Sequence, residues 1–292
     1  MGLSTDQLAR VCEQAEAEHI AAQLRAFAEL RPEAGAQLLP FAGGIAVLSA
    51  PELGHKLNRV TAAGIDEPLT DAALAELERR FAERSTALEI DLCPCADRRS
   101  FALLAARGYA VDSFTNTYAI DLAAAAPQPD RSAELSIAEL ERSDAEAFVA
   151  ASIAGFSAKL GARSAEQLEL LARIAVLRPR TERFVAYLAG VLVATAALAL
   201  LDTDAGPVAH LFLASTLPAA RARGVQQALL AHRLQHAREL GARVATVAAR
   251  PGTTSARNTE RTGLRLVFEK PTFRRPGDLP RRAASEAERL RR

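Results

Sequence analysis

Cysteine is scarce in this 292-residue sequence, and neither sign of charge predominates. The three cysteines, Cys12, Cys93 and Cys95, form an odd set, which argues against a disulfide framework and for a reducing, cytoplasmic location. The formal net charge of +1 gives no reason to expect the basic surface of a nucleic-acid-binding protein. We therefore expect no nucleic-acid partner.

The sequence also lacks a recognisable targeting or membrane segment. Its N-terminus is polar with a helical pattern, unlike a signal peptide. The longest uncharged apolar stretch, residues 185–201, contains Gly190 and Thr195. It fits two buried strands joined by a glycine turn better than a membrane span. No membrane partner is expected.

Metal ligands at useful spacings are missing as well. Cys93 and Cys95 flank a proline and resemble half of a zinc site, but no second Cys or His pair follows. His232 and His236 lie one helical turn apart and could ligate a metal, yet the sequence suggests no third ligand. We expect no metal, and a solvated helix face for the two histidines.

The length and composition indicate a globular protein of two domains, with 49% hydrophobic and 24% charged residues. An alanine run followed by Pro127 and Pro129 marks a stiffened linker. The tail is rich in arginine and alanine and has few large apolar residues, so we expect a frayed helix or a disordered segment. The predicted divisions are an N-terminal domain at 1–126, a linker at 127–133, a second domain at 134–275 and a tail at 276–292.

The second half alternates strands and helices in a clear order. The pattern predicts a strand, two helices, three strands joined by short turns, a long helix, a strand, a short helix and a final strand pair. Gly241 ends the long helix, and Gly263 ends the short one. This order predicts an α/β fold with a mixed, mostly antiparallel sheet flanked by helices. The elements are expected at 135–140, 143–156, 168–177, 183–188, 191–201, 208–216, 223–240, 243–249, 255–261 and 264–273.

The first half carries a weaker version of the same order. A helix over 71–83, with Thr70 as its N-cap, precedes a strand at 88–92, a helix at 97–106 and strands over 109–122. Gly108 and Gly263 occupy matching positions in the two halves. We interpret the chain as a duplicated fold.

The turn before the long helix has the features of an anion site. A strand ends, a proline-led loop follows, and the helix begins on a run that contains Arg221, Arg223 and Gly224. The first N–H groups of a helix have no internal partners, and the helix dipole adds positive potential. The two guanidinium groups add formal charge. These features alone predict a generic phosphate site.

The run Arg221-x-x-Gly224-x-Gln226 resembles the acetyl-CoA loop of the GNAT acetyltransferases, and the likeness covers most of residues 135–275. The resemblance implies a tandem GNAT protein that uses acetyl-CoA, or another acyl-CoA, as co-substrate. It implies that the preceding strand pairs through its backbone with the pantetheine amides. Ser255, Thr253 or Thr254 could orient a water, and Ser255 is included in the site. The implied cofactor-binding residues are Ala214, Ser215, Thr216, Arg221, Ala222, Arg223, Gly224, Val225, Gln226 and Ser255.

The resemblance implies direct attack of an amine on the thioester. The sequence departs from the family at positions that would assist this reaction. Gly252 stands where many members have Asn, and Thr259 stands where they have a Tyr that protonates the departing sulfur. A threonine hydroxyl is too weak an acid for that step, so water or Tyr187 is left for it. His210 is the candidate general base. Both strand residues have an alternative role in packing.

The N-terminal copy has an acidic run at 67–71 where the cofactor loop would lie, so we expect a degenerate copy without a second cofactor. The leading hypothesis is an N-acyltransferase that acetylates an amine of a small molecule. A non-catalytic coenzyme A-binding scaffold is one alternative. A tRNA-dependent aminoacyl transferase is another, although the low net charge disfavours it. The sequence leaves a homodimer open.

Overall fold

The computed structural model describes residues 3–123, 134–157 and 163–278. The linker predicted at 127–133 and most of the predicted tail lie outside these ranges. The chain forms two compact units, the first from Met1–Glu33 and Asn116–Phe268 and the second from Ala34–Thr115 and Glu269–Arg292. Within the described ranges, none of the helices has the length and apolarity that a membrane crossing requires.

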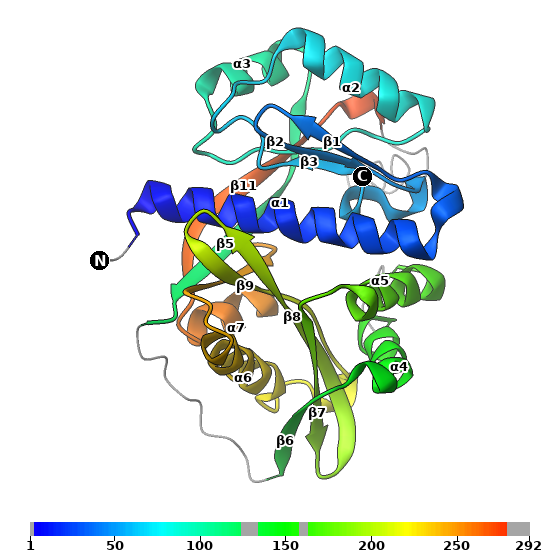
Figure 1. Cartoon of the computed structure of the whole chain (residues 1–292), viewed down its shortest axis with the longest axis vertical. Coiled ribbons are helices and arrows are strands. Elements are labelled where there is room, and N and C mark those ends of the chain that lie inside the picture. The colour runs from blue at the N-terminus through cyan, green and yellow to red at the C-terminus, as the bar shows by residue number, and fades with distance from the viewer. Residues whose placement is uncertain (1–2, 124–133, 158–162, 279–292) are drawn as a thin grey trace, which may run out of the picture. The chain divides into compact units, whose positions relative to one another are not determined.

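The first unit contains one sheet with helices on both faces (Figure 1). Its strand order is β5-β10-β9-β8-β7-β6, and every neighbouring pair is antiparallel except β9 with β10, which are parallel. The strands are β5 (Ala110–Asp121, of which 116–121 lie in this unit), β6 (Leu135–Glu139), β7 (Thr181–Leu188), β8 (Val191–Thr203), β9 (Gly206–Thr216) and β10 (Val244–Ala249). The helices are α1 (Thr5–Leu30), α4 (Ala145–Ser157), α5 (Ala165–Leu177), α6 (Val225–Glu239) and α7 (Thr254–Arg261).

Alternating residues of β8 show which helices cover each face of this sheet. Leu198 packs in a buried cluster with residues of α6 and α7, whereas its neighbour Ala197 packs with Phe148 of α4 and Ala175 of α5. Helix α1 lies on the second face, because the ring of its His19 contacts Phe212 of β9 at 4.6 Å. The period-two alternation of a strand therefore explains the two separate cores.

The second unit repeats the order of three strands, helix, strand and helix. Its sheet order is β1-β2-β3-β4-β11, with β3 and β4 parallel and the other pairs antiparallel. Leu74, Leu77 and Phe81 lie on one face of α2 and pack in the same core as Val60 and Ile90. The elements are β1 (Gln37–Phe41), β2 (Gly44–Leu48), β3 (Arg59–Thr61), α2 (Asp71–Glu83), β4 (Ile90–Asp91), α3 (Arg98–Ala106) and β11 (Arg265–Arg274).

The last strand of each half completes the sheet that contains the other half's strands. Tyr118 of β5 pairs with Val247 of β10, and Phe273 of β11 pairs with Ile90 of β4. Helix α1 packs with β8, β9 and α5 of the second half. The compact units therefore differ from the predicted divisions at 126, 134 and 275. The strand pair expected at 264–273 is one continuous strand, β11.

A buried carboxylate organises the sheet of the second unit. Asp91 of β4 is 3% exposed and accepts hydrogen bonds from Arg59 at 3.0 Å and from the Thr272 hydroxyl at 2.6 Å. His55 Nε2 lies 2.9 Å from both carboxylate oxygens. Burial raises the pKa of Asp91, but the charges of His55 and Arg59 more than offset this, so its pKa lies well below the usual range.

We expect Asp91→Asn to destabilise the second unit by about 3–5 kcal/mol at neutral pH, because the mostly buried Arg59 loses its counter-charge. A carboxylate with a depressed folded pKa stabilises the fold above its unfolded pKa of about 3.9, and this stability is lost as the pH falls below that value. The free energy of unfolding should therefore fall less in acid for the variant than for the wild type. Urea unfolding at pH about 7 and pH about 3 measures both effects.

Asp112→Asn is the matched control, because Asp112 is an exposed carboxylate that pairs with Arg274 in the same unit. It should cost less than about 1 kcal/mol. Equal losses in the two variants would contradict an organising role for Asp91.

Candidate functional site

Strands β9 and β10 separate before either of them ends. Their parallel ladder runs from Val208 with Val244 to Leu211 with Val247 and stops there, although β9 continues to Thr216 and β10 to Ala249. Beyond Leu211, β9 keeps its pairing with β8 on its other side. Its edge toward β10 therefore offers backbone N–H and C=O groups to an extended ligand. The predicted pantetheine-binding residues, Ala214, Ser215 and Thr216, lie in this segment.

A β-bulge distorts β9 within the same segment. Ser215 pairs with Thr195 and Phe212 pairs with Ala197, so two residues of β9 lie opposite Ala196 alone. One of the two, Leu213, has a φ of 49°. A bulge interrupts the ladder and redirects backbone groups, which is a common device beside functional sites.

Helix α6 supports the bulge through a buried arginine. Arg233 is 1% exposed, and its Nη1 donates to the carbonyl oxygens of Ala197 at 2.9 Å and Phe212 at 3.4 Å. Its Nε donates to Leu229 within the helix at 3.1 Å. Burial lowers the pKa of Arg233 to about 9, so the side chain remains cationic at neutral pH. Its charge is spread over carbonyl oxygens on both sides of the bulge.

Helix α4 supports the end of β9 from the opposite face of the sheet. Three buried hydroxyls form a chain in which Thr195 Oγ1 lies 3.0 Å from both Ser152 Oγ and Ser215 Oγ. The helix backbone comes so close at Gly155 that a Cβ there would lie 2.3 Å from Ser215 Oγ. Only glycine fits at this contact without displacement.

The loop between β9 and α6 bends through two left-handed residues, Ala222 with φ 62° and Gly224 with φ 75°. Gly224 is the N-cap of α6 and lacks a side-chain cap, so the first N–H groups of the helix point to an exposed loop. Arg221 Nε donates to the Thr216 carbonyl at 3.3 Å, and exposed Arg223 lies 3.6 Å from Glu134. The structure thus brings the predicted phosphate-binding residues together at one helix start.

The remaining predicted cofactor residues lie around this helix start. Val225 is buried, so only its backbone faces the loop. The Gln226 side chain accepts a hydrogen bond from Asn258 of α7 at 3.0 Å, which joins the two helices. Ser255 lies half-buried in the first turn of α7, after the N-cap Thr253.

The two candidate catalytic residues lie in well-packed surroundings. His210 is 8% exposed in the paired part of β9, with Nδ1 bonded to Thr246 Oγ1 at 3.0 Å and its ring 4.2 Å from the ring of His19. Tyr187 of β7 is half-buried against the cluster around Phe148 on the face covered by α4 and α5. These contacts are those of the packing role that the sequence left open for both residues.

The family position of the leaving-group acid lies inside the core of this protein. Thr259 of α7 is 1% exposed. Gly252, at the other departure from the family pattern, has a φ of 70° in the turn between β10 and α7. An Asn there would have to adopt a left-handed conformation, which Asn tolerates better than most residues.

Comparison with known families decides what this arrangement is. Residues 138–263 match the model of the Acetyltransferase (GNAT) family. This segment is a GNAT domain. It contains the diverging strands, the bulge and the turn with Arg221, Arg223 and Gly224. No curated protein matches the chain.

The whole chain has the fold of known GNAT structures. A GCN5-related N-acetyltransferase from Kribbella flavida is 20% identical, with a TM-score of 0.65 over 89% of this chain and 95% of that one. One from Sphaerobacter thermophilus is 15% identical, with a TM-score of 0.57 over 91% and 92%. A tandem GNAT protein from the clavulanic acid biosynthesis pathway is 13% identical, with a TM-score of 0.58 over 93% and 95%. The chain therefore shares its fold with these proteins over about nine-tenths of its length.

Sequence reasoning missed several residues that shape the GNAT domain. Gly155 interrupts an otherwise apolar helix, and an interior glycine of this kind is a detectable signal of close packing. Arg233 lies beside the apolar stripe of α6 and gives no such signal. Tyr118 comes from the first half of the chain, and its hydroxyl donates to Glu260 of α7 at 2.9 Å. Its position depends on the strand exchange, which local patterns do not reveal.

Proposed function

We propose that the protein is an acyl-CoA-dependent N-acyltransferase, which transfers acetyl from acetyl-CoA to an amine of a small molecule. One observation carries the proposal, namely that the free edge of β9 at 212–216 lies directly before the uncapped start of α6 at Gly224. An extended pantetheine arm fits the first, and a pyrophosphate fits the second. Membership of the GNAT family supports the same co-substrate.

The proposed reaction is direct attack of a neutral amine on the thioester carbonyl. The new C–N bond forms as the C–S bond breaks, and the coenzyme leaves as a thiolate. Backbone N–H groups redirected by the bulge at Leu213 and Ala214 are the proposed donors to the developing oxyanion. Thr259 is buried, so we assign protonation of the thiolate to water or to Tyr187. His210 remains the proposed base for the amine.

The proposal extends to the setting of the enzyme. We place it in the cytoplasm, acting on a small-molecule amine, without a metal in the acyl-transfer step and without nucleic-acid or membrane partners. A homodimer is compatible with this assignment. The few cysteines and the near-zero net charge support it.

Reversing the charge of the loop tests whether the protein binds coenzyme A there or only shares the GNAT fold. Arg221→Glu/Arg223→Glu should weaken acetyl-CoA binding by about 10- to 100-fold, because two charge-assisted phosphate contacts become repulsive. Isothermal titration calorimetry with the wild type should show binding on the micromolar scale, about −8 kcal/mol. No heat with acetyl-CoA, propionyl-CoA or free coenzyme A would refute the proposal.

Arg261→Glu/Arg265→Glu is the matched control, since it changes the net charge equally at two exposed positions, the last residue of α7 and the first residue of β11. It should leave acetyl-CoA binding within about twofold, because screening weakens distant charges. A loss equal to that of the loop variant would point to net charge rather than to a built phosphate site.

The buried Thr259 also favours a second candidate, a coenzyme A-binding protein without acyl transfer. The two candidates differ in one measurable product. Release of free thiol from acetyl-CoA in the presence of a broad panel of amines supports the transferase, whereas binding without amine-dependent release supports the scaffold.

A further inference from the structure

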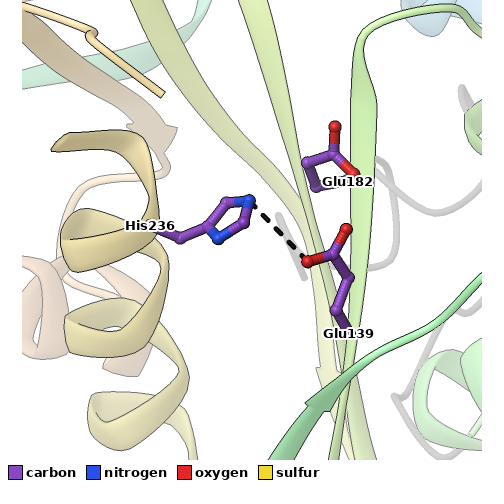
Figure 2. A group of neighbouring side chains, drawn as sticks. All are labelled: Glu139, Glu182 and His236. Atoms are coloured by element: carbon purple, nitrogen blue, oxygen red, sulfur yellow. Dashed lines mark ion pairs between the residues drawn. The ribbon is translucent and has the colours of Figure 1, made fainter. Parts of the chain in front are cut away.

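Three side chains with metal-ligating atoms meet on the α6 face of the sheet. Glu139 of β6, Glu182 of β7 and His236 of α6 each offer one atom, and these atoms all lie within 4.8 Å of one another. Figure 2 shows the imidazole pointing from the helix toward the two carboxylates on the neighbouring strands. His236 Nε2 lies 3.9 Å from Glu139 Oε2. Among the described residues, no other trio of His, Cys, Asp or Glu meets this condition.

The sheet register and one aromatic ring explain the convergence. Glu139 pairs with Phe184, and Glu182 precedes Phe184 by two residues, so the carboxylates are diagonal neighbours on one face. Phe184 meets the His236 ring edge-on, with centroids 5.2 Å apart. The phenyl ring thus fixes the imidazole above the carboxylate pair.

The chemistry of the trio calls for a shared cation. His236 Nε2 is inaccessible to solvent and has no hydrogen-bond partner in the described part of the chain, because 3.9 Å to Glu139 is too long. The two carboxylates repel each other. A buried imidazole nitrogen facing two crowded carboxylates matches the donor set of a divalent metal.

We infer that Glu139, Glu182 and His236 form a binding site for a divalent transition metal of the zinc class, separate from the proposed acyl-transfer site. Imidazole and carboxylate donors suit Zn²⁺, and three protein ligands leave a coordination position for water. Ca²⁺ and Mg²⁺ prefer oxygen ligands alone. Nε2 would ligate, while Nδ1 faces Glu239 at 3.9 Å, an outer partner of the kind that orients metal-bound histidines.

Closing the site requires only small movements. Zinc bonds of about 2.0–2.2 Å in a tetrahedron hold ligand atoms about 3.4 Å apart. The ligand atoms of the trio are separated by no more than 4.8 Å, so rotation of two glutamate side chains, both at least partly exposed, covers the difference. The metal would join β6, β7 and α6, and α6 carries Arg233 and the proposed phosphate-binding turn. We therefore assign it a structural role in holding α6 on the sheet.

The test measures metal binding to the full-length protein after treatment with EDTA and dialysis. All proteins carry Cys95→Ser, because Cys95 is an exposed thiol. Calorimetry with Zn²⁺ should show one equivalent bound, and Zn²⁺ should raise the melting temperature by mass action. His236→Gln and Glu182→Gln should each weaken binding by at least about 100-fold. Removing a residue that only orients a metal ligand costs up to about 100-fold, and removing a ligand itself should cost at least as much.

His232→Gln is the matched control, since His232 lies one turn earlier on α6 and its ring also packs edge-on against Phe184. It should bind Zn²⁺ like the parent protein. Co²⁺ spectra identify the ligands, and bands of a tetrahedral nitrogen and oxygen site support the inference. Absence of binding, a thiolate-to-cobalt band, or an affinity in the His236→Gln and Glu182→Gln variants equal to that of the parent protein would overturn it. Glu182→Gln supplies the result if His236→Gln does not fold.

Discussion

Gly155→Ala should destabilise the protein, although alanine normally stabilises the interior of a helix by about 1 kcal/mol relative to glycine. The new Cβ would lie 2.3 Å from Ser215 Oγ and 2.7 Å from Ser215 Cβ. Ser215 cannot easily yield, because its hydroxyl is bonded to Thr195 and its backbone pairs with β8. We expect a loss of about 1–3 kcal/mol or more.

The same substitution should impair the proposed coenzyme site, because it pushes on the end of β9. Acetyl-CoA binding should weaken by about tenfold or more, as the pantetheine-binding edge at 214–216 shifts away from α6. Chemical denaturation measures the first effect and calorimetry the second. A Gly155→Ala protein with wild-type stability would show that α4 can move away from β9 without cost.

A double-mutant cycle tests the cause. Ser215→Gly removes both clashing atoms and leaves the Thr216 backbone nitrogen at 3.4 Å as the nearest remaining contact. Gly155→Ala/Ser215→Gly should therefore recover at least about 1 kcal/mol relative to the sum of the single variants. Ala154→Gly, at the exposed neighbouring position of α4, is the control for helix propensity and should cost about 1 kcal/mol.

Arg233→Met should destabilise the GNAT domain by about 2–4 kcal/mol. Methionine fills much of the same space but donates no hydrogen bonds, so the carbonyl oxygens of Ala197 and Phe212 lose their partner. Each unsatisfied buried group costs about 1–3 kcal/mol, and removing a buried cation offsets part of the sum. Urea unfolding measures the loss. Hydrogen exchange should show faster exchange at Phe212, Leu213 and Ala214, because the bulge loses its support.

Arg238→Met is the matched control on the same helix. Arg238 Nε donates to the Leu122 carbonyl at 2.8 Å, but the side chain is only half-buried. We expect a cost of less than about 1.5 kcal/mol and no change in exchange at the bulge. Equal effects of the two substitutions would contradict a specific role for Arg233.

The element order was predictable because local signals agree with the final packing. The helix expected over 71–83 is α2, and Thr70 is its N-cap, with its hydroxyl accepting from the Ala73 N–H. The three strands before Arg221 and the helix after it also lie where the periodicity indicates. Each of these signals depends on neighbouring residues alone.

The strand exchange could not be predicted, because each closing strand could pair with the edge of either of the two sheets. Both β5 and β11 have a pattern typical of a closing strand, and nothing in either sequence specifies which sheet it joins. The proposed trio of metal ligands could not be predicted either, because only His236 belongs to a recognisable pattern, one helical turn after His232. Glu139 and Glu182 join it only through the register of β6 with β7. The loop before α6 could be recognised as a candidate cofactor loop because a run of adjacent residues, from Arg221 to Gln226, carries the pattern.

The exchanged closing strands have a consequence for how the chain is made. Strand β4 pairs with β11 at Thr272 and Phe273, nearly two hundred residues later in synthesis. The sheet whose strands are synthesised first therefore keeps an unpaired edge until almost the entire protein has left the ribosome. This is the arrangement that results when the two chains of a domain-swapped dimer are fused into one polypeptide. If the gene were split at the linker, each of the two polypeptides would complete its sheet only by pairing with the closing strand of the other.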